Sequence, residues 1–441
     1  MVSLLWGFLI SLMVLNYVES IVLLSFCLPV FIAYMYKVNV TLSSYLYMIN
    51  GIGNLLCFLT LFLLMLILLQ TGKGNKYSYY FYLMSLGVLL LLCFCANNIL
   101  LFYVYFESSL VPILLMILGW GYQPERLQAG MYMVMYTVAG SFPLLLLFLN
   151  LYYWNGSSDY YLLRSFGWFS SSGWVFVGLL AFLIKLPVYS MHVWLPKAHV
   201  EAPLGGSMVL AGILLKLGGY GLYFYNQLIT SSDSLLYYLI MSLSLWGGVI
   251  AGLLCLCQSD IKSMIAYSSI VHMSIVVTGV LSSISYGLVS ALITMIAHGW
   301  ASSMLFSLAY CTYLKVGSRS FLYSKGLLKL YPVLSLGWFL VLSTNMSVPP
   351  TLNFVGEMMF IPVASFFNFY FLMVFLVIMF LSVVYNMMLY IKVNHGAVSS
   401  YLGMSVSSLN SCELLVLFGH LVPLLLLIKG EIFLLFTVFC N

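Results

Sequence analysis

Residues 49–70 read INGIGNLLCFLTLFLLMLILLQ and contain no charged side chain. As an α-helix rising 1.5 Å per residue, a stretch of this length crosses the roughly 30 Å hydrocarbon core of a bilayer. The whole chain has the same character, because 64% of its 441 residues are hydrophobic and only 6% are charged. A soluble domain carries about 25% charged residues. The composition therefore excludes a water-soluble globule and predicts an all-α, polytopic membrane helix bundle.

Comparable apolar stretches follow one another along the chain, separated by glycine, proline and charged clusters. Read as helices of about 20 residues, they predict about 14 transmembrane helices. The expected limits are 2–17, 20–36, 49–70, 77–95, 98–119, 127–150, 172–189, 203–225, 233–255, 261–282, 286–313, 331–366, 367–393 and 411–428. We group them into N-terminal helices within 1–76, two five-helix sets at 77–225 and 226–393, and a C-terminal helix within 394–441.

The basic residues are distributed unevenly between the two alternating sets of loops. One set holds Lys73, Lys76, Arg126, Lys197, Lys262, Lys315, Arg319, Lys325, Lys329 and Lys392, and the other holds Lys37, Arg164 and Lys429. Lysine and arginine are enriched in loops that stay in the compartment of synthesis. An even number of helices places both termini on one side, and this bias predicts that they face away from that compartment.

Several kinds of site have no counterpart in the sequence. The nine cysteines lie mostly in apolar stretches, where a thiol behaves as a small hydrophobe. The pairs Cys93/Cys95 and Cys255/Cys257 have neither zinc nor iron–sulfur spacing. The chain also has no glycine-rich nucleotide-binding motif and no run of basic residues. We expect no disulfide, metal, nucleotide or redox cofactor in this chain, and no nucleic-acid partner.

Six ionisable residues fall near the middle of predicted helices, where a charge costs about 2.5–3.5 kcal/mol or more. They are Glu107, Lys185, Lys216, His272, His298 and Glu357. Burial disfavours the charged form of a lysine and a nearby carboxylate favours it, so Lys185 beside Glu107 would form a proton switch. Rows of such groups inside a helix bundle are typical of proton relays. The alternatives are hydrogen-bonded core histidines and buried ion pairs that only hold helices together.

Prolines interrupt two of these helices close to an ionisable residue. Pro187 follows Lys185, and Pro349 and Pro350 precede Glu357. A proline removes one helical hydrogen bond and forces a kink or a break. Broken membrane helices are typical of transport sites, because unpaired backbone groups are tolerated where they line a polar cavity. The seventh and twelfth helices are therefore predicted to be broken, although a single proline can also be a mere packing kink.

The two five-helix sets predict an internal repeat. A unit with an odd number of helices inserts upside down when it is repeated in tandem. In this register Lys185 and Glu357 both lie on the fourth helix of their set, and Glu107 and His272 on the second. Two inverted repeats with breaks in matching positions are typical of transporters. Lys216 and His298 have no partner in this match.

Five sequence stretches carry a resemblance to a known family. They are FESSLVP at 106–112, KLP at 185–187 running into MHVWLPKAHVEAP at 191–203, LKLGGYG at 215–221, SDIKSMIAYSSIVHM at 259–273 and MIAHG at 295–299. Together with PPTLNFVGE at 349–357 they cover roughly residues 97–360. They resemble the antiporter-like, proton-pumping membrane subunits of respiratory NADH:ubiquinone oxidoreductase (complex I). After His298 the chain departs from the family pattern, so its loop at 309–330 cannot be aligned with the family.

The resemblance implies a role for each residue. Glu107 and Lys185 would be the paired carboxylate and pumping lysine, and Lys216 the central relay lysine. His272 and His298 would be relay histidines, with His199 as a further possible member. Glu357 would be the terminal exit group, at a position where sister subunits usually carry lysine.

The resemblance also implies function, partners and location. The chain would pump protons as a subunit of an enzyme, without a cofactor of its own, while partner subunits hold NAD, FMN, iron–sulfur clusters and ubiquinone. Sister antiporter-like subunits, accessory subunits and membrane lipid would surround it. It would be a multi-pass protein of the mitochondrial inner membrane with both termini on the intermembrane-space side.

Two other functions remain open from the sequence. A stand-alone cation/proton antiporter would use the same lysines, and a structural membrane subunit would use the buried charges only as ion pairs. Glu357 in place of lysine, short soluble loops and no cluster of aspartates on one helix favour the subunit of a complex.

Overall fold

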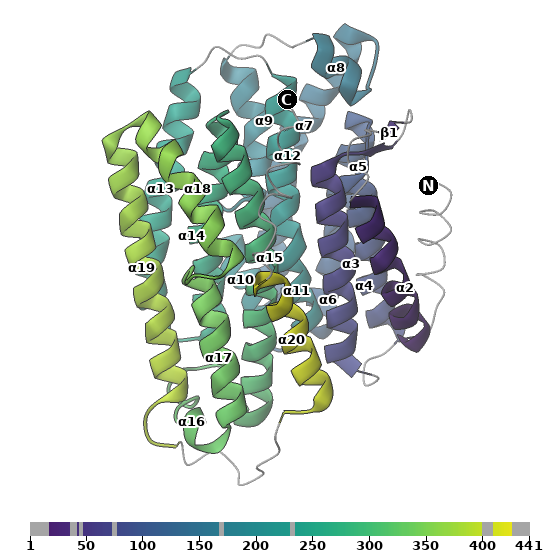
Figure 1. The fold of residues 1–441 in the computed structure, drawn as a ribbon. Coiled ribbons are helices and arrows are strands. Elements are labelled where there is room, and N and C mark those ends of the chain that lie inside the picture. Colours follow the sequence, from purple (N-terminus) through teal and green to yellow (C-terminus); the bar gives the residue numbers. More distant parts are fainter. Residues whose placement is uncertain are drawn as a thin grey trace. The chain divides into compact units, whose positions relative to one another are not determined.

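The structure, a computed structural model, describes residues 17–35, 42–43, 47–72, 77–166, 172–229, 234–398 and 409–425. Helices dominate this part of the chain (Figure 1). One short antiparallel hairpin is formed by β1 (Leu42–Ser43) and β2 (Met48–Ile49). The helix expected at 2–17 lies outside the described residues except for its last position, as do Lys37, Lys73, Lys76 and Lys429.

Within the described ranges, nine helical segments are long and apolar enough to cross a membrane. They are Gly51–Thr71, Tyr77–Phe94, Ile99–Trp120, Arg126–Asn155, Leu204–Leu228, Leu235–Leu256, Ile261–Leu281, Ser285–Val316 and Phe369–Asn394. Shorter apolar helices occupy Tyr17–Pro29, Ser172–Lys185, Pro332–Asn345, Leu352–Phe367 and Ser411–Leu425. The prediction of an all-α, polytopic membrane bundle is confirmed, whereas the count of 14 stays a prediction.

The described residues form two compact units, one covering the chain up to 186 and 201–239, the other 187–200 and from 240 onward. The chain passes from the first unit to the second within α13 (Ser234–Leu256). The predicted domain boundaries and the inverted relation between the repeats stay predictions.

The first unit is built around one fully buried segment, which consists of α11 (Leu204–Val209), η2 (Leu210–Leu214) and α12 (Leu215–Leu228). Its other helices are α2 (Tyr17–Met35), α3 (Gly51–Thr71), α4 (Tyr77–Phe94), α5 (Ile99–Ser108), α6 (Leu110–Trp120), α7 (Arg126–Asn155), α8 (Tyr160–Phe166) and α9 (Ser172–Lys185). Helix α12 contacts α9, α3 and α4.

Glycines let α12 and α9 approach each other closely. A Cβ atom added to Gly221 would lie 2.3 Å from the ring of Phe182, and one added to Gly178 would overlap the ring of Tyr225. Small residues at such contacts are typical of helix packing in membranes, where close van der Waals contact replaces the hydrophobic effect. This packing fixes the end of α9, and with it Lys185, against α12.

The second unit is built around α14 (Ile261–Leu281) and α15 (Ser285–Val316), whose apolar stretches are almost completely buried. It also contains most of α10 (Trp194–Glu201) and α13, with α16 (Leu327–Leu330), α17 (Pro332–Asn345), α18 (Leu352–Phe367), α19 (Phe369–Asn394) and α20 (Ser411–Leu425). Helix α15 contacts α14, α17, α18 and α20 (Figure 1). At the contact with α18, a Cβ atom on Gly356 would lie 2.6 Å from the Thr294 methyl carbon.

Both predicted helix breaks are present. Helix α9 ends at Lys185, and a turn containing Pro187 separates it from α10. Helix α17 ends at Asn345, and Pro349 and Pro350 lie in the turn before α18 begins at Leu352. These turns place helix ends beside ionisable residues, as the proline positions predicted.

Two further interruptions were not predicted. Helix α5 ends at Ser108 and α6 begins at Leu110, where Pro112 lacks the N–H that would continue the helical ladder across this point. In the buried segment, η2 is a stretch of π-helix. Short stretches of π-helix within α-helices often occur at functional sites. Each interruption lies within six residues of one of the predicted site residues, Glu107 and Lys216.

Candidate functional site

The first unit holds Lys185 in a buried position beside Phe106. The ammonium nitrogen donates a hydrogen bond to the Phe106 carbonyl oxygen at 2.9 Å. It also lies 3.1 Å from the centroid of the Phe106 ring. Attraction between a cation and an aromatic face reaches about 2 kcal/mol where water is excluded. Lys185 therefore has two neutral partners, both supplied by the residue that precedes Glu107.

Glu107 lies at the break between α5 and α6. Its Oε1 atom is buried and has no hydrogen-bond partner among the described groups. The carboxylate acts electrostatically on Lys185, yet the described side chains of these two residues form no ion pair. The sequence predicted Glu107 and Lys185 as neighbours, and the groups in direct contact with the lysine are the Phe106 ring and carbonyl.

Lys216 is completely buried in the central segment, and its ammonium donates to the Ala211 carbonyl at 2.6 Å. The π-helical turn explains why this carbonyl is available. The N–H of Leu215 bonds to Leu210, five residues back, whereas a regular α-helix would pair it with Ala211. The irregular turn thus supplies a backbone oxygen to a lysine of the same segment.

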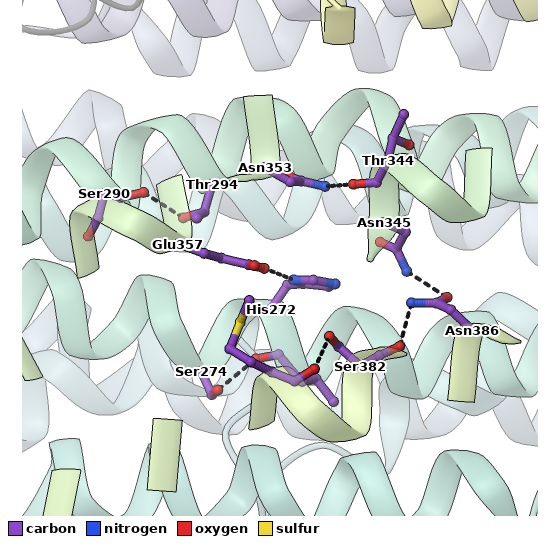
Figure 2. A network of polar contacts seen from close by, with 12 residues as sticks. His272, Ser274, Ser290, Thr294, Thr344, Asn345, Asn353, Glu357, Ser382 and Asn386 are labelled. Atoms are coloured by element: carbon purple, nitrogen blue, oxygen red, sulfur yellow. Dashed lines mark hydrogen bonds and ion pairs between the residues drawn. The ribbon is translucent and has the colours of Figure 1, made fainter. Parts of the chain in front are cut away.

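The second unit brings three predicted residues together from three helices. His272 lies on α14, His298 on α15 and Glu357 on α18, and each is almost fully buried. The Nδ1 atom of His272 lies 3.5 Å from Oε1 of Glu357 (Figure 2). The ring centroids of His272 and His298 are 5.4 Å apart. A carboxylate and two imidazoles at these separations can exchange protons directly or through one bridging water.

In this ion pair, each side chain has one polar atom that makes no hydrogen bond to the described groups. Nε2 of His272 and Oε2 of Glu357 are buried without a hydrogen bond to any described group. Nearby hydroxyls are engaged with their own helices: Ser274 donates to the Val271 carbonyl at 2.6 Å and Thr294 to the Ser290 carbonyl at 2.8 Å (Figure 2). Buried polar atoms of this kind are where ordered water binds in proteins.

His199 lies apart from this cluster. It is completely buried on α10, and its ring stacks on Phe306 of α15 with the centroids 4.7 Å apart. The end of α10 is held by Lys262 at 3.4 Å and Arg319 at 2.7 Å, which both donate to the Val200 carbonyl. Cations near the last carbonyls of a helix stabilise its C-terminus.

Four polar residues near Glu357 were missed by the sequence interpretation, which considered only charged residues and histidines. They are Asn345, Asn353, Tyr385 and Asn386, all of which are buried. The Asn353 amide donates to the Thr344 carbonyl at 2.9 Å, and that of Asn345 to Asn386 Oδ1 at 3.1 Å (Figure 2). A usable signal was the asparagine one helical turn before Glu357.

No group of three or more histidine, cysteine or acidic side chains that could hold a metal ion occurs in the ranges for which positions are described. The expectation that the chain carries no cofactor of its own stays a prediction.

Comparison with known proteins gives consistent results. The family model described as NADH:quinone oxidoreductase/Mrp antiporter, TM, matches residues 96–384. NADH-ubiquinone oxidoreductase chain 4 of Albinaria caerulea is 47% identical over 414 residues, covering 93% of this chain and 94% of the relative. The protein of the same name from Locusta migratoria is 45% identical over 342 residues, which cover 77% of this chain and 76% of that one.

Solved structures share the fold. A chain of respiratory complex I from Thermus thermophilus with bound NADH matches with a TM-score of 0.87 and 22% identity, covering 99% of this chain and 98% of that one. A chain of the Mrp complex from Dietzia sp. matches with a TM-score of 0.82 and 16% identity, covering 95% and 90%.

Proposed function

Because the chain belongs to the NADH:quinone oxidoreductase/Mrp antiporter family of membrane proteins, we propose that it is the chain 4 subunit of mitochondrial NADH:ubiquinone oxidoreductase. It translocates protons through its buried lysine, glutamate and histidine residues. The partner subunits oxidise NADH and reduce ubiquinone, and NAD, FMN, iron–sulfur clusters and ubiquinone bind there. The stand-alone antiporter is less well supported, because relatives that align along most of this chain are named as subunits of the oxidoreductase.

The observation that carries the mechanism is the buried pair of His272 and Glu357, 3.5 Å apart with the His298 ring beside it. Each partner has one atom outside the pair that is free of hydrogen bonds to described groups. A pair that served only to hold helices together would stabilise them best with its remaining atoms satisfied. The open atoms support a pair that exchanges protons with its surroundings.

The contacts of the two lysines favour reversible protonation. A backbone carbonyl accepts a hydrogen bond from an ammonium group and from a neutral amine alike. Lys185 and Lys216 both donate to such carbonyls. Each lysine can therefore lose its proton and keep this hydrogen bond. A salt bridge to a carboxylate would instead oppose the loss of the proton. We propose that Lys185 loads and releases protons, that Glu107 modulates it, and that Lys216 relays them.

The remaining roles follow the same reasoning. His272 and His298 pass protons on, and Glu357 is the terminal exit group. The His199 ring stacks on Phe306, which favours a structural role for His199 over a direct step in proton transfer. Moving one charge against 100 mV takes about 2.3 kcal/mol, and the redox reactions in the partner subunits supply this energy through electrostatic coupling.

The setting in the membrane is part of the proposal. The chain is a multi-pass protein of the mitochondrial inner membrane, and sister antiporter-like subunits, accessory subunits and lipid cover its apolar sides. The ten-to-three bias of basic residues between the two sets of loops supports termini on the intermembrane-space side. Tags at each end, tested for protease access in intact and ruptured mitoplasts, would check this orientation.

The test of the function uses the assembled oxidoreductase in proteoliposomes. Lys185→Met keeps the length of the side chain and removes its proton site, so we expect NADH-driven proton transport to fall at least about tenfold, which corresponds to a barrier raised by about 1.4 kcal/mol. Lys197→Met is the matched control, because Lys197 lies on the short helix α10, between predicted membrane helices and outside the proposed relay. Unchanged pumping in the assembled Lys185→Met complex would leave only a structural role.

A second measurement separates the subunit from the antiporter. The wild-type chain is purified alone, placed in liposomes and tested for sodium/proton exchange across an imposed pH gradient. We expect no exchange above that of empty liposomes. Sodium transport by the isolated chain would favour the antiporter instead.

A further inference from the structure

The segment that connects α15 to α17 is strongly basic, and it lies where the sequence departs from the family pattern. Residues 315–329 contain four cationic side chains and no acidic one. These side chains are Lys315, Arg319, Lys325 and Lys329. The preference of basic residues for one side of the membrane accounts for the side on which they lie. It does not account for their concentration in one segment.

This segment is joined to the end of α19, which carries a further lysine, Lys392. The backbone N–H of Gly326, the residue after Lys325, donates to the His395 carbonyl at 3.2 Å. The Lys392 ammonium lies 5.0 Å from the centroid of the Phe321 ring. Helix α16 also contacts α19, beside its last turns (Figure 1). Lysines from two separate stretches of the chain therefore meet at one end of the second unit.

Three of these lysines have no anionic partner. Among the residues that the structure describes, Lys325, Lys329 and Lys392 form no ion pair and donate no side-chain hydrogen bond. Lys329 is exposed, and the other two are partly exposed. The Phe321 ring fixes the position of the Lys392 ammonium without neutralising its charge. We call these three lysines the basic cluster, and its unpaired charges attract anionic groups.

An exposed apolar face of α19 leads away from the basic cluster. Ile391 lies directly before Lys392, and Met387, Val383 and Phe380 follow it at intervals of four and three residues toward the start of the helix. All four are exposed, and this spacing places them on one helix face. From Ile391 to Phe380 the face runs about 16 Å, which is roughly half the thickness of the hydrocarbon core.

A second exposed apolar face lies on α17, which begins three residues after Lys329. Val333, Leu336 and Phe339 are exposed there. The two helices contact each other, and the Phe339 ring packs edge-on against Tyr390, with the centroids 5.8 Å apart. The basic cluster is therefore continuous with apolar surface on two adjacent helices.

We propose that the basic cluster binds the phosphate group of an anionic phospholipid, whose acyl chains lie along the exposed faces of α17 and α19. Basic residues at the membrane end of transmembrane helices are typical of sites for anionic lipid headgroups. An acidic segment of a partner protein would also suit the lysines. Only a lipid, however, combines the negative charge with apolar chains of the length that the adjoining faces offer. The site does not involve the buried residues of the proton relay.

The experiment uses the protein in its assembled complex, reconstituted in phosphatidylcholine vesicles. Two lipid probes carry the same photoactivatable group in the acyl chain, one with a phosphatidylglycerol and one with a phosphatidylcholine headgroup. After irradiation, the labelled peptides are identified by mass spectrometry. We expect the phosphatidylglycerol probe to label the peptides that contain residues 333–339 and 380–391 about tenfold more than the phosphatidylcholine probe.

Two triple variants test the lysines. Lys325→Gln, Lys329→Gln and Lys392→Gln together remove the charges of the basic cluster, and we expect them to lower phosphatidylglycerol labelling to the level of phosphatidylcholine. Lys73→Gln, Lys76→Gln and Lys197→Gln together are the matched control. They remove the same number of charges from the same predicted set of loops outside the cluster, and labelling should equal that of the wild type.

Several results would overturn the proposal. Equal labelling of the wild type by both probes would mean that lipid covers these faces without recognition of its headgroup. A preference for phosphatidylglycerol that survives loss of the cluster, or that the control variant loses equally, would exclude the three lysines as the headgroup site. Absence of labelling, together with chemical cross-links from the cluster to carboxylates of a partner subunit, would show that an acidic protein surface occupies it. Because the wild-type comparison needs no variant, the proposal stays testable even if the cluster variant fails to assemble.

Discussion

Lys185 and Lys216 in the first unit contact backbone carbonyl oxygens, whereas His272 in the second unit contacts a carboxylate. When a proton binds to Lys185, the new positive charge is not neutralised by an anionic group in direct contact with it. Between His272 and Glu357, a proton can change sides without changing the charge of the pair. The first arrangement makes the lysine responsive to electric fields from outside its own contacts, and the second suits transfer between neighbours.

The contrast also bears on stability. Replacing a lysine removes one donor from a neutral carbonyl, which costs about 1–3 kcal/mol at most, whereas removing one member of a buried carboxylate–imidazole pair can leave a charge uncompensated, which costs about 3–5 kcal/mol. The second cluster should therefore be more vulnerable than the first to the loss of one member.

The largest effect is expected for Glu357→Leu. This variant removes the partner of His272, whose ring is then buried with both nitrogen atoms lacking an acidic partner. Loss of one partner of a buried pair costs about 3–5 kcal/mol if the imidazole stays charged, and about 1–3 kcal/mol if it becomes neutral. We expect no transport and less assembled complex, measured by activity and on native gels. Glu357→Gln, which keeps a hydrogen-bonding side chain, should assemble but not pump.

Equal assembly of Glu357→Leu and Glu357→Gln would contradict this comparison. It would mean that His272 is satisfied without the carboxylate, and that the second cluster tolerates loss of a member as well as the first.

An intermediate effect is expected for Phe106→Leu in the first cluster. The aromatic face under the Lys185 ammonium is lost, but the backbone carbonyl of residue 106 remains as hydrogen-bond acceptor. The lost cation–π contact is worth about 1–2 kcal/mol where water is excluded. Its loss should lower the proton transport rate between about fivefold and thirtyfold. The measurement is NADH-driven proton uptake by proteoliposomes at matched amounts of assembled complex.

Phe102→Leu is the control for this prediction, since Phe102 packs against Phe106 without contacting the lysine nitrogen in the described contacts. If both variants lowered transport equally, the effect would be one of packing, and the ring would not stabilise the charged lysine.

The sequence was sufficient for the features that follow from the cost of charge in lipid. A lysine, glutamate or histidine in the middle of an apolar stretch is visible at once, and its depth follows from counting residues. For this reason all six ionisable residues could be predicted to lie deep in the bundle, whereas only the structure shows that His272, His298 and Glu357 form one cluster. Prolines likewise marked the turns after Lys185 and before Glu357, because a missing N–H has a direct structural consequence.

The sequence did not predict how each helix is rotated about its own axis, nor where its backbone departs from regular α-helix. Counting residues gives the depth of Lys185 but not the direction of its side chain, so the Phe106 carbonyl could not be distinguished from Glu107 as its partner. The π-helical turn at Leu210–Leu214 contains no proline and follows no simple pattern. The amide pair Asn345–Asn386 was overlooked because uncharged polar residues are common in this chain, and only tertiary contacts single them out.

The smallest effect is expected for Ser274→Ala, two residues after His272. The hydroxyl donates to the Val271 carbonyl of its own helix, and this carbonyl is also within the helical ladder (Figure 2). Removing such a local bond changes stability by no more than about 0.5 kcal/mol, and the hydroxyl has no described bond to His272 or Glu357. We expect assembly and protons moved per NADH to equal the wild type. A marked loss of pumping would mean that the relay in the second unit extends along α14 through hydroxyl groups. Direct contact between an acid and a base would then no longer distinguish the second cluster from the lysines of the first.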